Sequence, residues 1–261
     1  MAYETILLSV DGGVAHLTLN RPEQANAIDA RMAAELRDAA ITIRFDPATR
    51  VVLLDANGKL FCGGGDLQAF RSAGDGAGNA LANIAGDLHV ALSTFAAMDA
   101  PVIAAVRGSA GGAGMSIVAG ADIVVAGERA KFTMGYTAVA LAPDGGSTFF
   151  LSRVVGLRRA MDLVLTNRAL DAATACEWGL VTRVVADDRV DEEARTLAQA
   201  LAAGSRQSLG AAKRLVLAGA NASLAEAFAR EAMAISAAAA TADGREGVAA
   251  FVEKRPPAFD R

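Results

Sequence analysis

The chain begins with two short apolar segments whose pattern predicts a β-hairpin. Residues 3–10 and 14–19 alternate between apolar and polar positions or run apolar, and Asp11-Gly12-Gly13 separates them. Two such segments joined by a glycine-containing turn are typical of paired antiparallel strands. The first structural element is therefore expected to be a hairpin.

Helix-like and strand-like patterns alternate through the next part of the chain. Apolar residues recur every three to four positions in 30–45 and 80–98, which predicts helices with one buried face. A glycine-rich turn leads into a further predicted helix over 111–120. Short apolar runs predict buried strands at 51–55, 102–106 and 122–126. This alternation favours an α/β fold whose strands are joined by helical crossovers.

Beyond residue 157 the pattern is nearly all helical. Amphipathic segments predict helices at 157–166, 171–178, 189–203, 205–219, 223–240 and 244–252. One strand-like run, 180–185, interrupts them. The pattern divides the chain into an α/β core, residues 1–200, and a helical C-terminal region, residues 201–261.

Composition and charge exclude several classes of function. Hydrophobic residues make up 53% of the 261 residues, which favours a packed core over disorder. The formal net charge is −4 and no basic cluster stands out, so the positive surface that nucleic-acid binding requires is missing. The longest uncharged segment, 108–121, is too short to cross a bilayer as a helix. We expect neither a nucleic-acid partner nor a membrane-spanning segment.

The cysteines and histidines predict no metal site and no disulfide framework. Cys62, Cys176, His16 and His89 are the only residues of these types and lie far apart in the sequence. The N-terminus carries Glu4 in its apolar stretch and lacks the basic start of a secretory signal. Reduced thiols without such a signal predict a cytoplasmic protein.

Two glycine-rich segments that follow strands are candidate ligand-binding elements. They are LFCGGGDL at 60–67 and RGSAGGAGMS at 107–116. A helix starting near Gly112 would direct unpaired N–H groups outward, and glycine lets the backbone approach a ligand closely. Two such turns facing each other would form an oxyanion hole. Each segment alone is also compatible with a tight turn, and neither matches a dinucleotide or Walker A pattern.

These segments belong to a series of motifs that resembles one protein family. In chain order the motifs are NRPEQANAID (20–29), LFCGGGDL (60–67), PVIAAVRGSAGGAG (101–114) and FVEKRPPAF (251–259). Their order and spacing resemble those of the enoyl-CoA hydratase/isomerase family, also called the crotonase superfamily. The resemblance implies an α/β fold built as a spiral of ββα units, followed by a C-terminal helical trimerisation region.

The resemblance further implies an acyl-CoA thioester as substrate and no separate cofactor, since coenzyme A arrives with the substrate. It places the two oxyanion-hole donors at the backbone N–H groups of Gly65 and Ala113. These would hold the negative charge of a thioester enolate. One such donor is typically worth about 3 kcal/mol in the transition state.

The resemblance also implies positions that bind coenzyme A. They are Ala25, Ala27, Gly63, Asp66, Leu67, Phe251 and Lys254. In the family the C-terminal positions often close the site of a neighbouring subunit, so a homotrimer or a hexamer of two trimers is implied. Lys254 could meet a phosphate or be an ordinary solvated lysine.

Two positions depart from the hydratases of this family. Those enzymes activate water with two glutamates, and the matching positions here hold Ser116 and Tyr136. Neither side chain is a carboxylate base. The sequence therefore argues against two-glutamate hydration, and we expect Tyr136 to line the acyl pocket.

Asp144, within APDGGST at 142–148, is the candidate catalytic carboxylate. Its position resembles that of an aspartate in dienoyl-CoA isomerases, the ring-epoxide isomerase of phenylacetyl-CoA breakdown and 4-chlorobenzoyl-CoA dehalogenase. In the isomerases this aspartate moves protons. We expect Asp144 to act as acid and base in isomerising an unsaturated or ring-containing acyl-CoA. Capping the helix that follows is its alternative role.

His89 keeps a second reaction open. It lies twelve residues before Pro101, where the dehalogenase also has a histidine, so His89 and Asp144 could hydrate or hydrolyse an unsaturated or aryl-CoA. A single histidine on a helix is more often structural. A triad of Ser116, His89 and Asp144 is disfavoured by the acyl-CoA motifs. A non-catalytic acyl-CoA-binding protein is the alternative outside the enzymes.

Overall fold

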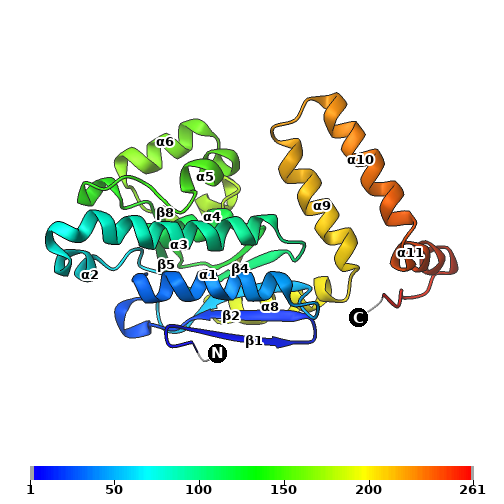
Figure 1. Ribbon diagram of the computed structural model, residues 1–261, viewed down its shortest axis with the longest axis horizontal. Helices are drawn as coiled ribbons and strands as arrows, with labels where there is room; N and C mark the ends of the chain where they lie inside the picture. Colours follow the sequence, from blue (N-terminus) through cyan, green and yellow to red (C-terminus); the bar gives the residue numbers. More distant parts are fainter. Residues whose placement is uncertain (1–2, 260–261) are drawn as a thin grey trace.

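The computed structural model describes residues 3–259 and contains two β-sheets covered by helices (Figure 1). The larger sheet has the strand order β1-β2-β3-β4-β6-β9. Its strands are β1 (Ile6–Asp11), β2 (Val14–Leu19), β3 (Val51–Ala56), β4 (Val102–Val106), β6 (Ile123–Gly127) and β9 (Arg183–Val185). The predicted hairpin is confirmed as the antiparallel pair β1–β2, and every later pair in this sheet is parallel.

The central strands are apolar on both faces because helices cover both sides of the sheet. Helices α1 (Ala30–Phe45) and α3 (Ala77–Ala97) pack over one face, where Val52 and Leu54 of β3 are buried. Helix α8 (Val190–Ala202) packs on the other face against Val51 and Leu53. Continuous apolar runs such as VVLL are typical of parallel strands enclosed in this way.

A second sheet escaped prediction because its strands are too short to show a period. It contains β5 (Ser109–Gly111), β7 (Lys131–Thr133) and β8 (Leu170–Asp171), in that order. β5 leads through one glycine into α4 (Ala113–Gly120), the helix expected after the second glycine-rich segment. The small sheet therefore fixes where α4 begins.

Most remaining helices match the sequence pattern, and the differences have local causes. The expected helices are α6 (Leu157–Thr166), α7 (Ala172–Glu177), α9 (Arg206–Gly219), α10 (Leu224–Ala239) and α11 (Ala242–Glu253). Two further helices, α2 (Leu67–Ser72) and α5 (Ser147–Val155), are short and were not predicted. The strand expected over 180–185 begins only at Arg183, because the N–H groups of Leu180 and Val181 bond to the carbonyl of Ala175.

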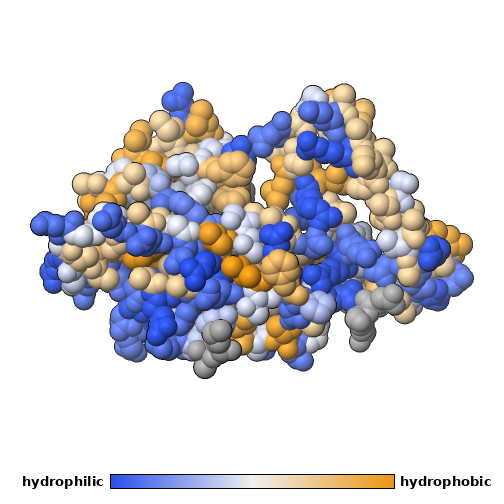
Figure 2. All heavy atoms as spheres, in the orientation of Figure 1, coloured by the Kyte–Doolittle hydropathy of each residue, from blue (hydrophilic) through white to orange (hydrophobic). Residues whose placement is uncertain are grey.

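Helices α9, α10 and α11 project from the body as an arm (Figure 1). No side chain of α10 is buried, although the helix carries several large apolar residues, namely Leu224, Phe228, Met233 and Ile235. Figure 2 shows a notch between the body and this arm, with apolar residues along α10. Exposed apolar surface of this extent is typical of an interaction surface. The domain boundary near residue 200 stays a prediction.

Residues 74–97 are long and apolar enough to span a membrane by length and composition alone. In this fold the segment contains α3, whose side chains Ile84, Leu88 and Leu92 are buried in the same core cluster as α1. One face of this segment is thus buried in the core of the protein.

Lys213, on α9, joins the arm to the sheet. Its ammonium group lies 2.7 Å from Asp122 Oδ2 and donates to the carbonyl oxygens of Phe95 at 2.7 Å and Ala100 at 3.2 Å. Burial lowers the pKa of Lys213, and the nearby Asp122 carboxylate opposes that shift. The same carboxylate oxygen accepts the N–H of Val102 at 2.8 Å. The Lys213 ammonium group therefore interacts with three acceptors at the edge of the body.

Replacing Lys213 by methionine should lower the free energy of unfolding by about 2–3 kcal/mol, because two carbonyl oxygens lose a donor and the Asp122 carboxylate loses its ion-pair partner at once. Urea unfolding followed by circular dichroism, at a fixed protein concentration, would measure this change. Lys59→Met, at an exposed position, is the control and should stay within about 0.5 kcal/mol of the original protein. Equal stability of the two variants would contradict an anchoring role for Lys213.

Candidate active site

The two glycine-rich segments meet backbone to backbone under one cavity. The Gly111 N–H donates to the Cys62 carbonyl at 2.9 Å, next to a parallel bridge between Cys62 and Ala110. Gly64 has a φ of +107°, and a Cβ placed on it would lie 3.1 Å from the Gly111 carbonyl oxygen. Only a residue without a side chain fits this contact comfortably.

Gly65 and Ala113 carry backbone amides at this contact. Ala113 is the first residue of α4, so its N–H has no partner within the helix. Among the hydrogen bonds of residues 3–259, no acceptor is found for either amide. Both residues line the same cavity, and the start of α4 adds the positive end of a helix dipole. This arrangement can stabilise an oxyanion.

The loop between the hairpin and α1 is held in place by Asn26, a residue that was not among the candidates from the sequence. Asn26 is 1% exposed and has a φ of +51°. Its side-chain amide donates to the carbonyls of Asn57 at 2.8 Å and Leu60 at 2.9 Å, and accepts the N–H of Arg21 at 2.8 Å. The sequence feature that could have pointed to Asn26 is its position inside the motif NRPEQANAID.

Five of the residues that the resemblance assigns to coenzyme A binding, Ala25, Ala27, Gly63, Asp66 and Leu67, lie together around this loop. The Gly63 N–H donates to the Ala25 carbonyl at 2.8 Å, which joins the loop to the first glycine-rich turn. The Arg21 guanidinium donates to the Ala27 carbonyl and lies 3.1 Å from Asp66 Oδ2. Asp66 also caps α2, so one carboxylate fixes both the loop and the helix that starts beside the cavity.

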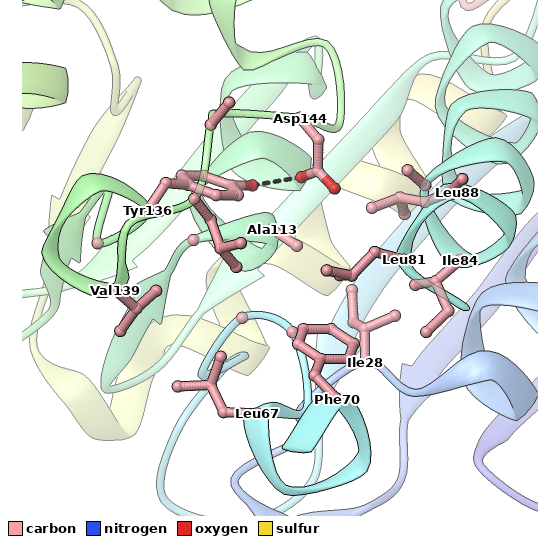
Figure 3. Close-up of a pocket in the computed structure, with 18 of the residues that line it drawn as sticks. Ile28, Leu67, Phe70, Leu81, Ile84, Leu88, Ala113, Tyr136, Val139 and Asp144 are labelled. Atoms are coloured by element: carbon pink, nitrogen blue, oxygen red, sulfur yellow. Dashed lines mark hydrogen bonds between the residues drawn. The ribbon is translucent and has the colours of Figure 1, made fainter. Parts of the chain in front are cut away.

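The cavity has a volume of about 380 Å³ and is mostly apolar (Figure 3). Six residues that the sequence offered as site candidates line it, namely Gly63, Gly65, Leu67, Ala113, Tyr136 and Asp144. Further apolar side chains complete its walls, namely Ile28, Phe70, Leu81, Ile84, Leu88, Val139 and Leu141. Asp144 is the one charged side chain among the described residues of the lining.

Tyr136 and Ser116 contact Asp144 directly. The Tyr136 hydroxyl donates to Asp144 Oδ1 at 2.6 Å (Figure 3), and the Ser116 hydroxyl lies 3.0 Å from the phenol oxygen. Burial, reinforced by the negative charge of Asp144, raises the pKa of Tyr136. The phenol therefore keeps its proton at neutral pH and remains a donor to the carboxylate.

The capping role of Asp144 and the serine triad are both wrong. Gly146 is the N-cap residue of α5 and no side chain caps that helix, so the Asp144 carboxylate is left for the cavity. His89 lies on the exposed side of α3, where its Nε2 accepts the N–H of Gly145 at 3.1 Å. Within residues 3–259 no hydrogen bond joins His89 to Ser116, so no triad is formed.

Phe251 and Lys254 lie on the arm and outside the lining of the cavity. Phe251 is 86% exposed on α11, and Lys254 ends that helix with a φ of +54°. Their contribution to the site of a neighbouring subunit stays a prediction.

Replacing Gly64 by alanine should lower the free energy of unfolding by about 1–3 kcal/mol, because the new Cβ is strained at positive φ and presses on Gly111. Gly86→Ala is the matched control. Gly86 lies on α3, and a new Cβ there would have no neighbour within 4 Å. Alanine at this position should therefore raise the free energy of unfolding by about 0.5–1 kcal/mol. Chemical denaturation of both variants measures the difference. A Gly64→Ala protein as stable as the original would refute the tight contact.

Known proteins resemble this chain over nearly its full length. The model of the enoyl-CoA hydratase/isomerase family matches residues 9–261. A Rhodobacter capsulatus protein named "Probable enoyl-CoA hydratase" is 37% identical over 262 residues, 99% of each chain. The 1,2-epoxyphenylacetyl-CoA isomerase of Escherichia coli is 37% identical over 264 residues, 98% of each chain.

The fold is shared more closely than the sequence. A crystal structure described as an enoyl-CoA hydratase/isomerase from Mycobacterium abscessus superposes with a TM-score of 0.94 at 36% identity. The match covers 98% of this chain and 99% of that chain. Since both sequence and fold match over nearly the full length, this chain belongs to the enoyl-CoA hydratase/isomerase family.

Proposed function

We propose that this member of the family isomerises an unsaturated or ring-containing acyl-CoA thioester, with Asp144 as acid and base. Family membership makes the chain an acyl-CoA enzyme; the choice of isomerisation rests on one observation. Asp144 is the single charged side chain among the described residues that line the cavity. Gly65 and Ala113 line the same cavity. One carboxylate suffices to move a proton between two carbons of one substrate.

The proposed reaction begins with the thioester carbonyl oxygen between the N–H groups of Gly65 and Ala113. These donors stabilise the negative charge that develops when Asp144 removes a proton from an acyl carbon. Asp144 then returns the proton to a different carbon, which moves the double bond or rearranges the ring. The apolar walls exclude water and strengthen the electrostatic contribution of both amides.

The residues at positions 116 and 136 support isomerisation over hydration. Both are hydroxyl side chains, and both are hydrogen-bonded near Asp144, so neither supplies a second carboxylate base. The names of the relatives do not decide the matter, since the Escherichia coli protein is named an isomerase and the Rhodobacter capsulatus protein a hydratase.

Asp144→Asn should lower kcat for double-bond migration in a 3-enoyl- or 2-enoyl-CoA by at least about 100-fold, because the amide cannot accept the proton. Absorbance of the migrating double bond measures the rate, and calorimetric titration with a CoA thioester should show unchanged affinity. Asp75→Asn, at an exposed position outside the cavity, is the control and should keep full activity. Full activity in Asp144→Asn would rule out the proposed mechanism.

Hydration or hydrolysis is the second candidate, because His89 bonds to Gly145 beside the catalytic candidate. Reaction in oxygen-18 water separates the two, since only hydration or hydrolysis places the label in the product. Labelled product that disappears in His89→Ala would favour this second candidate. Tight thioester binding without turnover of any tested acyl group would instead indicate a non-catalytic binding protein.

We also propose that the chain assembles as a trimer or as two paired trimers through the arm. Met233 and Ile235 on α10 are 75% and 72% exposed, as expected for side chains that a neighbouring copy covers. Met233→Glu combined with Ile235→Glu should shift the protein to a monomer in gel filtration with light scattering. Met233→Leu is the conservative control. A monomer of the unaltered chain would contradict the proposal.

A further inference from the structure

Ser116, Tyr136 and Asp144 form a hydrogen-bonded unit in the wall of the cavity. Ser116 is fully buried on α4, and its hydroxyl lies 3.0 Å from the Tyr136 oxygen and 3.1 Å from the Asp144 carbonyl oxygen. Tyr136 precedes a single helical turn, Thr137–Val139, so its ring reaches the cavity from a different segment. The unit therefore links α4, the turn after β7 and the loop that carries Asp144.

The number of hydroxyl protons in this unit decides which group donates in each hydrogen bond. A tyrosine hydroxyl has one proton, and the short 2.6 Å contact to Asp144 Oδ1 uses it. Ser116 can therefore only donate toward the phenol oxygen or toward a backbone carbonyl. Because the acceptor is a carboxylate, the Tyr136 bond is charge-assisted and strong while Asp144 is ionised.

The backbone around Asp144 is held as firmly as its side chain. Gly145 has a φ of +59°, and a Cβ there would lie 2.8 Å from the Ser116 side chain. The Gly145 N–H donates to His89 Nε2, which ties the loop to α3. The loop is thus contacted by His89 of α3 through a hydrogen bond and by Ser116 of α4 through close packing.

The other carboxylate oxygen of Asp144 is left for a ligand. No hydrogen bond of Oδ2 is found within residues 3–259, and this oxygen is not among the buried polar atoms that lack a partner there. Figure 3 shows it directed away from Tyr136, over the space between Ala113 and Leu88. Ala113, whose amide is one of the two proposed donors to the thioester oxygen, lines the same cavity.

We propose that Tyr136 is a positioning residue that holds Asp144 by Oδ1 and presents Oδ2 as the atom that takes and returns the substrate proton. This rests on the proposed function of Asp144. When Oδ2 gains the proton, the carboxyl group becomes neutral and its bond to Tyr136 weakens. Tyr136 therefore holds the carboxylate in one orientation while Oδ2 faces the substrate.

Tyr136→Phe tests this role because it removes only the hydroxyl and keeps the ring in the cavity wall. The expected result is a fall in kcat of about 10- to 100-fold with KM changed by less than about threefold, since a charge-assisted bond to the base is lost while substrate contacts remain. Tyr3→Phe is the matched control, because Tyr3 is the chain's other tyrosine and lies outside the lining of the cavity.

A spectroscopic measurement tests the bond itself independently of turnover. The chain has two tyrosines, so protein labelled with 3-fluorotyrosine should give two fluorine NMR signals, and Tyr3→Phe assigns the signal of Tyr136. Asp144→Asn should shift the Tyr136 signal and leave that of Tyr3 in place. If Tyr136→Phe fails to fold, Ser116→Ala is the second variant, with a smaller decrease in kcat expected.

The outcomes separate this inference from the proposed function. Unchanged kcat in Tyr136→Phe, or a raised KM alone, would overturn the positioning role while Asp144→Asn remained inactive. A Tyr136 fluorine signal that does not shift in Asp144→Asn would also overturn the positioning role. Full activity of Asp144→Asn would instead refute the proposed function. A decrease in kcat together with the predicted shift of the Tyr136 signal would support both.

Discussion

The backbone contact between the two glycine-rich turns is the constraint on which the rest of the site depends. The carbonyl oxygen of Gly111 lies against Gly64, and a Cβ on Gly114 would lie 2.5 Å from the Cys62 carbonyl oxygen. Neither turn can move toward the other, and the small sheet holds the second turn at the start of α4. The two free amides are therefore positioned by packing before any substrate arrives.

The polar groups of the cavity gain their effect from the apolar walls around them. A carboxylate and two amide donors in a cavity lined by leucine, isoleucine and phenylalanine interact more strongly than they would in water. Asp144 is held in this setting by hydrogen bonds from neighbouring segments, with Tyr136 at its side chain and His89 at the next residue. A single carboxylate held among apolar walls suits the proposed proton transfer within one substrate.

Much of the fold was predictable because long elements leave a period in the sequence. The hairpin, the central strands and the helices α1, α3, α8, α9, α10 and α11 all match their patterns to within a few residues. The small sheet and α2 were missed because two to six residues hold too little periodicity. Residues such as Asn26 and Arg21 were missed because their role is to bond to backbone groups that are distant in sequence.

The sequence by itself determined the α/β architecture, the family and the candidates Gly65, Ala113 and Asp144, since motifs and hydrophobic periods are local properties of the chain. Only the tertiary structure decided which candidates share a cavity. The tertiary structure brings His89 to the backbone of Gly145 and the Tyr136 hydroxyl to the Asp144 carboxylate. The physical reason is that hydrogen bonds between separate segments depend on how β5, α3 and α4 pack, and no short stretch of sequence encodes that packing.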